Sequence, residues 1–168
     1  MTRLSVAVRP PPDVVATLAE LPRPPLPGVI WALPEQWIVK VRPLGHVDER
    51  LVPDLAEVLR DALDGAPPAR CVLGPATVRL GGQWLAAPVD GLAELGRAVF
   101  EATEPLVPVT HPQPFRADLV LARGQVPAHL AGTRVDASWQ AEVVSLVADR
   151  SAPGRPRLVD LVEVQLTG

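Results

Sequence analysis

The residues of this sequence that could transfer a proton are few. The 168-residue chain has three histidines, at His46, His111 and His129, and they lie far apart in the sequence. Imidazole has an unperturbed pKa near working pH, so a pair of histidines can supply both a general acid and a general base. We expect a surface or capping role for each isolated histidine. Cys71 is the only cysteine, so no intrachain disulfide can form.

Two short stretches, one in each half of the chain, combine charged residues with a strand pattern. Trp37–Gly45 has the sequence WIVKVRPLG and contains Lys40, the only lysine among 16 lysine and arginine residues. Pro114–Arg123 has the sequence PFRADLVLAR and contains Asp118. Both alternate with period two, which is typical of a β-strand with one face in the core. Two such strands predict a duplicated architecture with a shared cleft.

These two stretches resemble the signature strands of the two-histidine phosphoesterases, in particular the bacterial 2′-5′ RNA ligase or RNA 2′,3′-cyclic phosphodiesterase branch. The segments LSVAVRPPPDVV, LGPATVRLGGQWLAAPVDGLAEL and AVFEAT also resemble this family, in the same order and spacing. The resemblance therefore covers nearly the whole chain. Because function depends on the site rather than on the fold, the resemblance implies the family more strongly than the activity.

The resemblance implies a His-x-Thr motif on each signature strand, and all four motif positions are changed here. The first motif falls on Ile38 and Lys40, and the second falls on Asp118 and Val120. In the family, the histidines act as acid and base on a 2′,3′-cyclic phosphate or a 2′-5′ linkage, and the threonines steady the phosphate oxygens. Isoleucine transfers no proton, and an ionised aspartate accepts a proton but cannot donate one. We therefore expect that the mechanism of the family is lost.

The residues that remain at these strands suggest an anion site. Lys40, Arg42, Arg116 and Arg123 are the predicted ligand-binding residues, since arginine forms paired hydrogen bonds to oxyanions. Arg123 matches the basic residue that closes the second motif of the family. We also predict that the Lys40 ammonium and the Asp118 carboxylate meet across the cleft.

The rest of the sequence predicts an α+β fold. The elements predict two antiparallel sheets that face each other, with helices outside, and the resemblance implies a bilobal, pseudo-two-fold arrangement around a central cleft, in one two-lobed domain over residues 1–168. Apolar periodicity and turn residues predict strands at 3–8, 28–32, 37–43, 71–80, 83–88, 117–123, 139–147 and 157–165, and helices at 10–21, 49–64 and 91–103.

Composition limits the partners. A net charge of −3 gives no general attraction to nucleic acid, so contact with RNA would need a local patch of positive charge. The apolar runs are too short to cross a bilayer, and the N-terminus lacks the features of a signal peptide, so we expect a cytoplasmic protein without a membrane partner. We expect no metal and no cofactor.

Three interpretations of function remain open. The first is a catalytically inactive relative of the RNA phosphodiesterases whose cleft binds an RNA end or a cyclic nucleotide. The second is an active phosphodiesterase that uses altered residues, with Asp118 as the base and arginines that stabilise charge. The third is a structural or protein-interaction module with a vestigial cleft and a protein partner.

Overall fold

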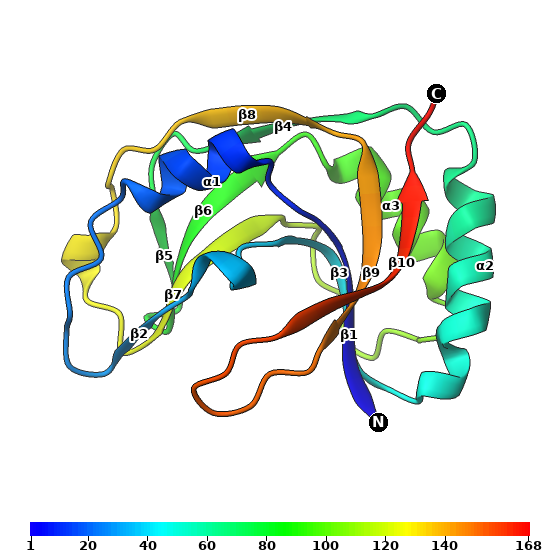
Figure 1. The fold of residues 1–168 in the computed structure, drawn as a ribbon, viewed down its shortest axis with the longest axis horizontal. Coiled ribbons are helices and arrows are strands. Elements are labelled where there is room, and N and C mark those ends of the chain that lie inside the picture. The colour runs from blue at the N-terminus through cyan, green and yellow to red at the C-terminus, as the bar shows by residue number, and fades with distance from the viewer.

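Three α-helices and ten β-strands make up the computed structural model, which describes all residues from 1 to 168 (Figure 1). The helices are α1 (Pro12–Ala19), α2 (Val52–Leu63) and α3 (Ala93–Thr103). The strands are β1 (Thr2–Val8), β2 (Val29–Trp31), β3 (Val39–Val47), β4 (Ala69–Leu73), β5 (Val78–Leu80), β6 (Trp84–Asp90), β7 (Asp118–Gly124), β8 (Ala137–Ala141), β9 (Val143–Asp149) and β10 (Leu158–Gln165).

The strands form one curled antiparallel sheet with two halves. The order is β10-β9-β1-β3-β7-β6-β4-β8, and β2 and β5 pair with β7 and β6. We call β10-β9-β1-β3 the first half and the strands from β7 to β8, with β2 and β5, the second half. The halves are joined through β3 and β7, which pair at the single position Val39–Leu119. The two antiparallel sheets expected from the sequence are thus present as the halves of one sheet, and the α+β prediction is confirmed.

Helices cover the outside of each half. Helices α2 and α3 pack together and against β10 and β3 of the first half, whereas α1 packs against β8 of the second half (Figure 1). The amphipathic pattern of α2 explains its position, because Leu55, Leu59 and Leu63 recur on one face and are buried. One cluster of 37 buried apolar residues runs through both halves.

The segment predicted as a helix from residue 49 begins with a 3₁₀ turn, and α2 itself begins at Val52. The Asp48 carboxylate accepts a hydrogen bond of 3.0 Å from the Arg50 backbone N–H and so caps a 3₁₀ turn at Glu49–Leu51. Helix α2 follows directly, with Pro53 in its first turn, where a missing N–H has no cost. No helix of the chain is long and apolar enough to cross a membrane.

Two predicted strands are each divided in the structure. The prediction at 139–147 corresponds to β8 and β9, which belong to different halves and are separated by Glu142. The prediction at 71–80 corresponds to β4 and β5, which are separated at Gly74 and Pro75. Proline has no N–H to donate, so it does not extend a central strand. In both segments the chain leaves one paired strand and enters another, although the side-chain pattern alone predicts one continuous strand.

Candidate functional site

A cleft of about 440 Å³ lies on the concave face of the sheet and includes side chains from both halves. All four altered motif positions line it, namely Ile38, Lys40, Asp118 and Val120. The register at Val39 and Leu119 places Ile38 opposite Val120 and Lys40 opposite Asp118. The floor of the cleft therefore has an apolar side and a charged side.

A β-bulge follows each motif and repeats the same local geometry in both halves. The pairing of β1 with β3 passes from Ala7–Lys40 to Val6–Arg42, so Val41 is the extra residue. The pairing of β7 with β6 passes from Val120–Ala86 to Ala122–Leu85, so Leu121 is the extra residue. A bulge adds one residue to one strand and changes which face the following side chains occupy.

The bulge at Val41 corrects the prediction for Arg42. Arg42 is 6% exposed and does not line the cleft. Its guanidinium donates to the Thr103 hydroxyl and the Val107 carbonyl and lies 5.0 Å from the centroid of the Phe100 ring. Burial lowers the pKa of Arg42, and Glu104 opposes that shift. Arg42 thus anchors α3 to the first half and is not available to a ligand in the cleft.

Lys40 lies in the cleft near Arg3 and Asp149. Partial burial is the main factor that lowers the pKa of Lys40, the positive charge of Arg3 lowers it further, and the Asp149 carboxylate acts in the opposite direction. Neither Lys40 nor Arg3 forms an ion pair within 4.0 Å. Both cations therefore remain available to an anion.

Asp118 does not pair with Lys40, and that expectation was wrong. The Arg116 guanidinium donates a hydrogen bond of 2.7 Å to Asp118 Oδ2, and no ion pair joins Asp118 to Lys40 within 4.0 Å. Arg116 lies two residues earlier in the chain and therefore reaches the carboxylate at low entropic cost. The hydrogen bond that Arg116 donates to Asp118 raises the pKa of Arg116. Asp118 Oδ1 is buried without a hydrogen-bond partner.

Arg123 lies in the cleft, and Arg116 does not line it. Arg123 is paired with Ile30 of β2 on one side and with Trp84 of β6 on the other. All three side chains line the cleft, and Trp84 is 42% exposed. Arg123 forms no ion pair within 4.0 Å. One end of the cleft therefore has a free guanidinium between an aromatic and an aliphatic side chain.

Sequence reasoning missed several residues of the cleft. Arg3 and Ser5 reach it from β1, and Asp149 reaches it from β9. The alternation in RLSVAV could have identified the first two, because Arg3 and Ser5 occupy one face and the buried Leu4 and Val6 the other. Asp149 gave no such signal, since its position depends on which strand pairs with β1.

No histidine lines the cleft. His46 lies exposed within β3, His111 is exposed in the loop after α3, and His129 lines a separate cavity described below. No group of three or more histidine, cysteine, aspartate or glutamate side chains could hold a metal ion. Burial raises the pKa of the Cys71 thiol to about 11. The cations that line the cleft are Arg3, Lys40 and Arg123.

Solved structures resemble the whole chain, whereas no protein-family model and no curated protein sequence matches it. TT0787 of Thermus thermophilus aligns with a TM-score of 0.87 and 24% identity over 99% of this chain and 98% of that one. Escherichia coli LigT in complex with 3′-AMP aligns with a TM-score of 0.84 and 20% identity over 99% of each chain. The chain has the LigT fold. The MHV ns2 PDE domain is more distant, with a TM-score of 0.58 and 12% identity over 88% of this chain and 99% of that one. The two-histidine phosphoesterase fold that the sequence resembles is confirmed.

Proposed function

We propose that the chain is a member of the two-histidine phosphoesterase superfamily that binds the phosphorylated end of an RNA or a nucleotide without hydrolysing it. The observation that carries this proposal is the set of cleft cations, Arg3, Lys40 and Arg123, none of which has an ion-pair partner within 4.0 Å. Arginine binds phosphate oxygens through paired hydrogen bonds, and lysine adds a compact charge. Solved structures of LigT contain 3′-AMP, ATP, NADP+ or phosphate. These complexes support a nucleotide or a phosphate as the ligand class.

The charge balance within the cleft favours an anion. Two carboxylates also line it, but Asp118 is neutralised by Arg116, which leaves Asp149 against three cations. The Asp149 carboxylate accepts a hydrogen bond of 2.9 Å from the Ser151 backbone N–H. Although burial would raise the pKa of Asp149, this hydrogen bond and the nearby Lys40 and Arg3 lower it overall. The three cations therefore exceed the local negative charge.

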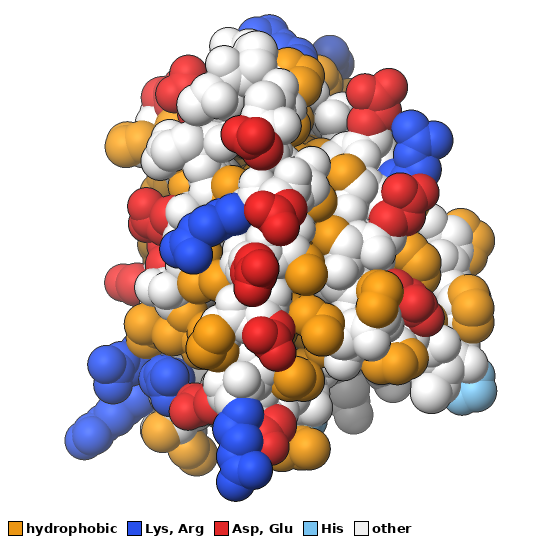
Figure 2. Space-filling view, turned by 90° about the vertical axis from the view of Figure 1, so that its right-hand side faces the viewer, with side chains coloured by type: hydrophobic (Ala, Val, Ile, Leu, Met, Phe, Trp, Pro, Cys, Tyr) orange, Lys and Arg blue, Asp and Glu red, His pale blue; other side chains and the backbone are white.

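The outer surface disfavours non-specific binding to nucleic acid. Figure 2 shows a row of acidic side chains on the face that carries α2. The exposed acidic residues of this segment are Asp54, Glu57, Asp61 and Asp64. Like charges repel a phosphate backbone, so an anionic ligand is directed to the cleft and away from the helices.

The hydrolytic mechanism lacks its two proton carriers. The positions of the histidines are held by Ile38, which is 5% exposed and packs with Ala7 and Val147, and by Asp118. General acid and general base catalysis each contribute about 10²–10⁴ in rate. A cleft that keeps the cations and loses both imidazoles retains binding while most of the catalysis is lost.

A second candidate is an active phosphodiesterase with a rebuilt acid–base pair. The buried Oδ1 of Asp118 has no hydrogen-bond partner, so it could accept a proton from an attacking hydroxyl. Lys40 lies on the opposite strand with a lowered pKa, which makes its ammonium a better proton donor than an ordinary lysine. This candidate predicts turnover that depends on Asp118.

The test is to measure binding and hydrolysis on the same samples. The ligands are adenosine 2′,3′-cyclic phosphate, 3′-AMP and a tetranucleotide with a 2′,3′-cyclic end. We expect calorimetric binding without hydrolysis, weakened about tenfold or more by Arg123→Gln, because a hydrogen bond to a charged group contributes about 1.5–3 kcal/mol. Arg97→Gln is the matched control, since Arg97 is exposed on α3 and makes no hydrogen bond or ion pair.

Two other results would contradict the proposal. Hydrolysis that disappears in Asp118→Ala would establish the second candidate. An absence of both binding and hydrolysis, in protein whose circular dichroism shows a folded chain, would support the structural or protein-interaction module.

A further inference from the structure

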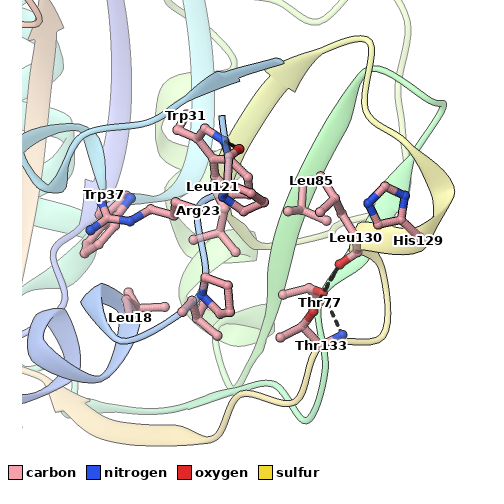
Figure 3. A pocket seen from close by; sticks show the side chains of 13 residues that line it. Leu18, Arg23, Trp31, Trp37, Thr77, Leu85, Leu121, His129, Leu130 and Thr133 are labelled. Carbon is pink, nitrogen blue, oxygen red and sulfur yellow. Dashed lines mark hydrogen bonds between the residues drawn. The ribbon is translucent and has the colours of Figure 1, made fainter. Parts of the chain in front are cut away.

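A second cavity lies on the core-facing side of β7 and has a volume of about 130 Å³ (Figure 3). Leu121, the bulged residue of β7, lines this cavity, whereas Asp118 and Val120 line the cleft. The end of α1 and the proline-rich loop that follows it supply the opposite wall through Leu18 and Leu21. Trp31 lines both the cavity and the cleft.

The walls of this cavity suit an apolar group about the size of one ring. The apolar lining side chains come from α1, the loop after it, β2, the segment before β3, β6, β7 and the 3₁₀ turn near residue 129: Leu18, Leu21, Pro22, Pro24, Trp31, Trp37, Leu85, Leu121 and Leu130. An engineered apolar cavity of about 150 Å³ in another protein binds benzene. The volume therefore matches a group about the size of one benzene ring.

Most polar groups of the lining already have partners. The Trp31 indole N–H donates to the Pro24 carbonyl at 2.8 Å. The Thr77 hydroxyl donates to the Leu130 carbonyl at 3.0 Å and accepts from the Thr133 N–H at 3.1 Å, as the dashed lines of Figure 3 show. These groups shape the cavity and are not free for a ligand.

Three lining side chains that can donate, those of Arg23, Trp37 and His129, have no hydrogen-bond partner. The exposed Arg23 guanidinium lies 5.6 Å from the centroid of the Trp37 ring and forms no hydrogen bond or ion pair. Figure 3 shows Arg23 extended across the cavity side toward Trp37. The Trp37 indole Nε1 is buried without a hydrogen-bond partner. No carboxylate lines the cavity, so a ligand with an anionic group matches its charge.

We propose that this cavity binds a small aromatic carboxylate. The ring lies among Leu18, Leu85 and Leu121, and the carboxylate accepts hydrogen bonds from Arg23. A planar carboxylate matches the two parallel donors of a guanidinium, and the apolar ring replaces water against the leucines. The site shares Trp31 with the cleft but neither Lys40 nor Arg123, so its proposed anion contact does not rest on the function proposed above.

The test uses benzoate as the probe on the full chain. Saturable binding is measured by calorimetry, with benzyl alcohol and acetate as comparison ligands that lack the charge and the ring. We expect Arg23→Gln to weaken benzoate binding about tenfold or more and to leave benzyl alcohol unchanged, because only the charge-assisted hydrogen bonds are lost. Arg97→Gln is the matched control and should bind benzoate as the wild type does.

Two further measurements locate the bound ligand. Leu21→Trp at the half-buried rim should fill part of the cavity and abolish binding of both benzoate and benzyl alcohol. In NMR spectra, benzoate should shift the indole N–H signals of Trp31 and Trp37 and leave those of Trp84 and Trp139 in place, because only the first two line the cavity.

The opposite results would overturn the proposal. These are an absence of saturable binding, equal benzoate affinity in Arg23→Gln and Arg97→Gln, or a dominant shift of the Trp84 signal. Trp84 lines the cleft, so that shift would place the carboxylate among the cleft cations instead.

Discussion

The two halves of the sheet share one backbone plan and differ in chemistry at their motif positions. Each half has a signature strand beside the shared Val39–Leu119 position and a β-bulge directly after the second motif residue. The first half supplies Ile38 and then Lys40, whereas the second half supplies Asp118 and then Val120. The order of apolar and charged residues is thus reversed. The comparison shows that the two halves have equivalent backbone geometry although the residues at their motif positions differ.

The position after each bulge differs as well. In the first half it is Arg42, whose buried guanidinium contacts Thr103, Val107 and Phe100 of α3 and the segment after it. In the second half it is Ala122, a buried methyl group that requires no polar partner. Arg42 therefore links the first half to α3 through hydrogen bonds, whereas Ala122 makes no such polar link in the second half.

The largest effect is expected when a His-x-Thr motif is introduced in both halves. The quadruple variant Ile38→His, Lys40→Thr, Asp118→His and Val120→Thr should hydrolyse a 2′,3′-cyclic nucleotide at least about 10²-fold faster than the wild type, since acid and base roles each contribute about 10²–10⁴. Initial rates of product formation measure the effect. Variants with the motif in only one half are the controls. Their rate of hydrolysis should be well below that of the quadruple variant, because each has only one of the two proton carriers. A quadruple variant that is folded but inactive would show that the cleft differs beyond these four positions.

The second prediction concerns the buried cation of the first half. Arg42→Ala should lower the free energy of unfolding by roughly 2–3 kcal/mol, because the Thr103 hydroxyl and the Val107 carbonyl lose a charged donor. Urea denaturation measures this change. Arg97→Ala is the matched exposed control and should change the free energy of unfolding by less than about 0.5 kcal/mol. If Arg42→Ala and Arg97→Ala changed the free energy of unfolding equally, the buried guanidinium of Arg42 would not be needed to attach α3 to the first half.

The third prediction is a pH dependence that belongs to Lys40. Because folding lowers the pKa of Lys40, the unfolded chain binds more protons between the two values, and the contribution of Lys40 to stability increases with pH there. Binding of a phosphate has the opposite sign, since the anion needs the protonated amine. Affinity for 3′-AMP should therefore fall by about tenfold as pH rises through the lowered pKa, below the usual lysine range. Lys40→Arg should remove this fall, because arginine stays charged. Calorimetry from about pH 7 to about pH 10 would detect it, and an identical profile in both proteins would contradict the role of Lys40.

The smallest expected effect concerns Arg116. Arg116→Gln removes the partner of the Asp118 carboxylate and leaves an additional negative charge in the second half. Affinity for 3′-AMP should fall by about two- to fivefold, since an exposed ion pair contributes about 0.2–1 kcal/mol. Asp118→Asn combined with Arg116→Gln should recover the affinity. A loss that persists in the double variant would mean that Arg116 contacts the ligand directly.

The sequence predicted the parts of the fold that depend on side-chain periodicity. The alternation around Lys40 and Asp118 placed both signature strands. The leucine spacing in α2 placed that helix to within a few residues. Such patterns can be recognised in a single sequence because each element buries one face in the core.

What the sequence did not predict depends on pairing between strands. The bulge at Val41 was not visible, since valine suits a core position with or without a bulge, and Arg42 was therefore assigned to the wrong face. The division of 137–149 into β8 and β9 was not visible either, because apolar residues continue on both sides of Glu142. The pairing of Asp118 with Arg116 could have been expected, since residues two apart share a face of an extended strand.

The single paired position between the halves has a mechanical consequence. Main-chain hydrogen bonds stiffen each half along its strands, but across the middle they act only at Val39 and Leu119. We therefore expect the sheet to bend more easily between β3 and β7 than within either half, and such bending would widen the cleft. An anion held by Lys40 on one side and Arg123 on the other would oppose that widening, and slower amide hydrogen exchange along β3 and β7 would record its presence. A phosphate bound by both halves would therefore restrict their movement relative to each other.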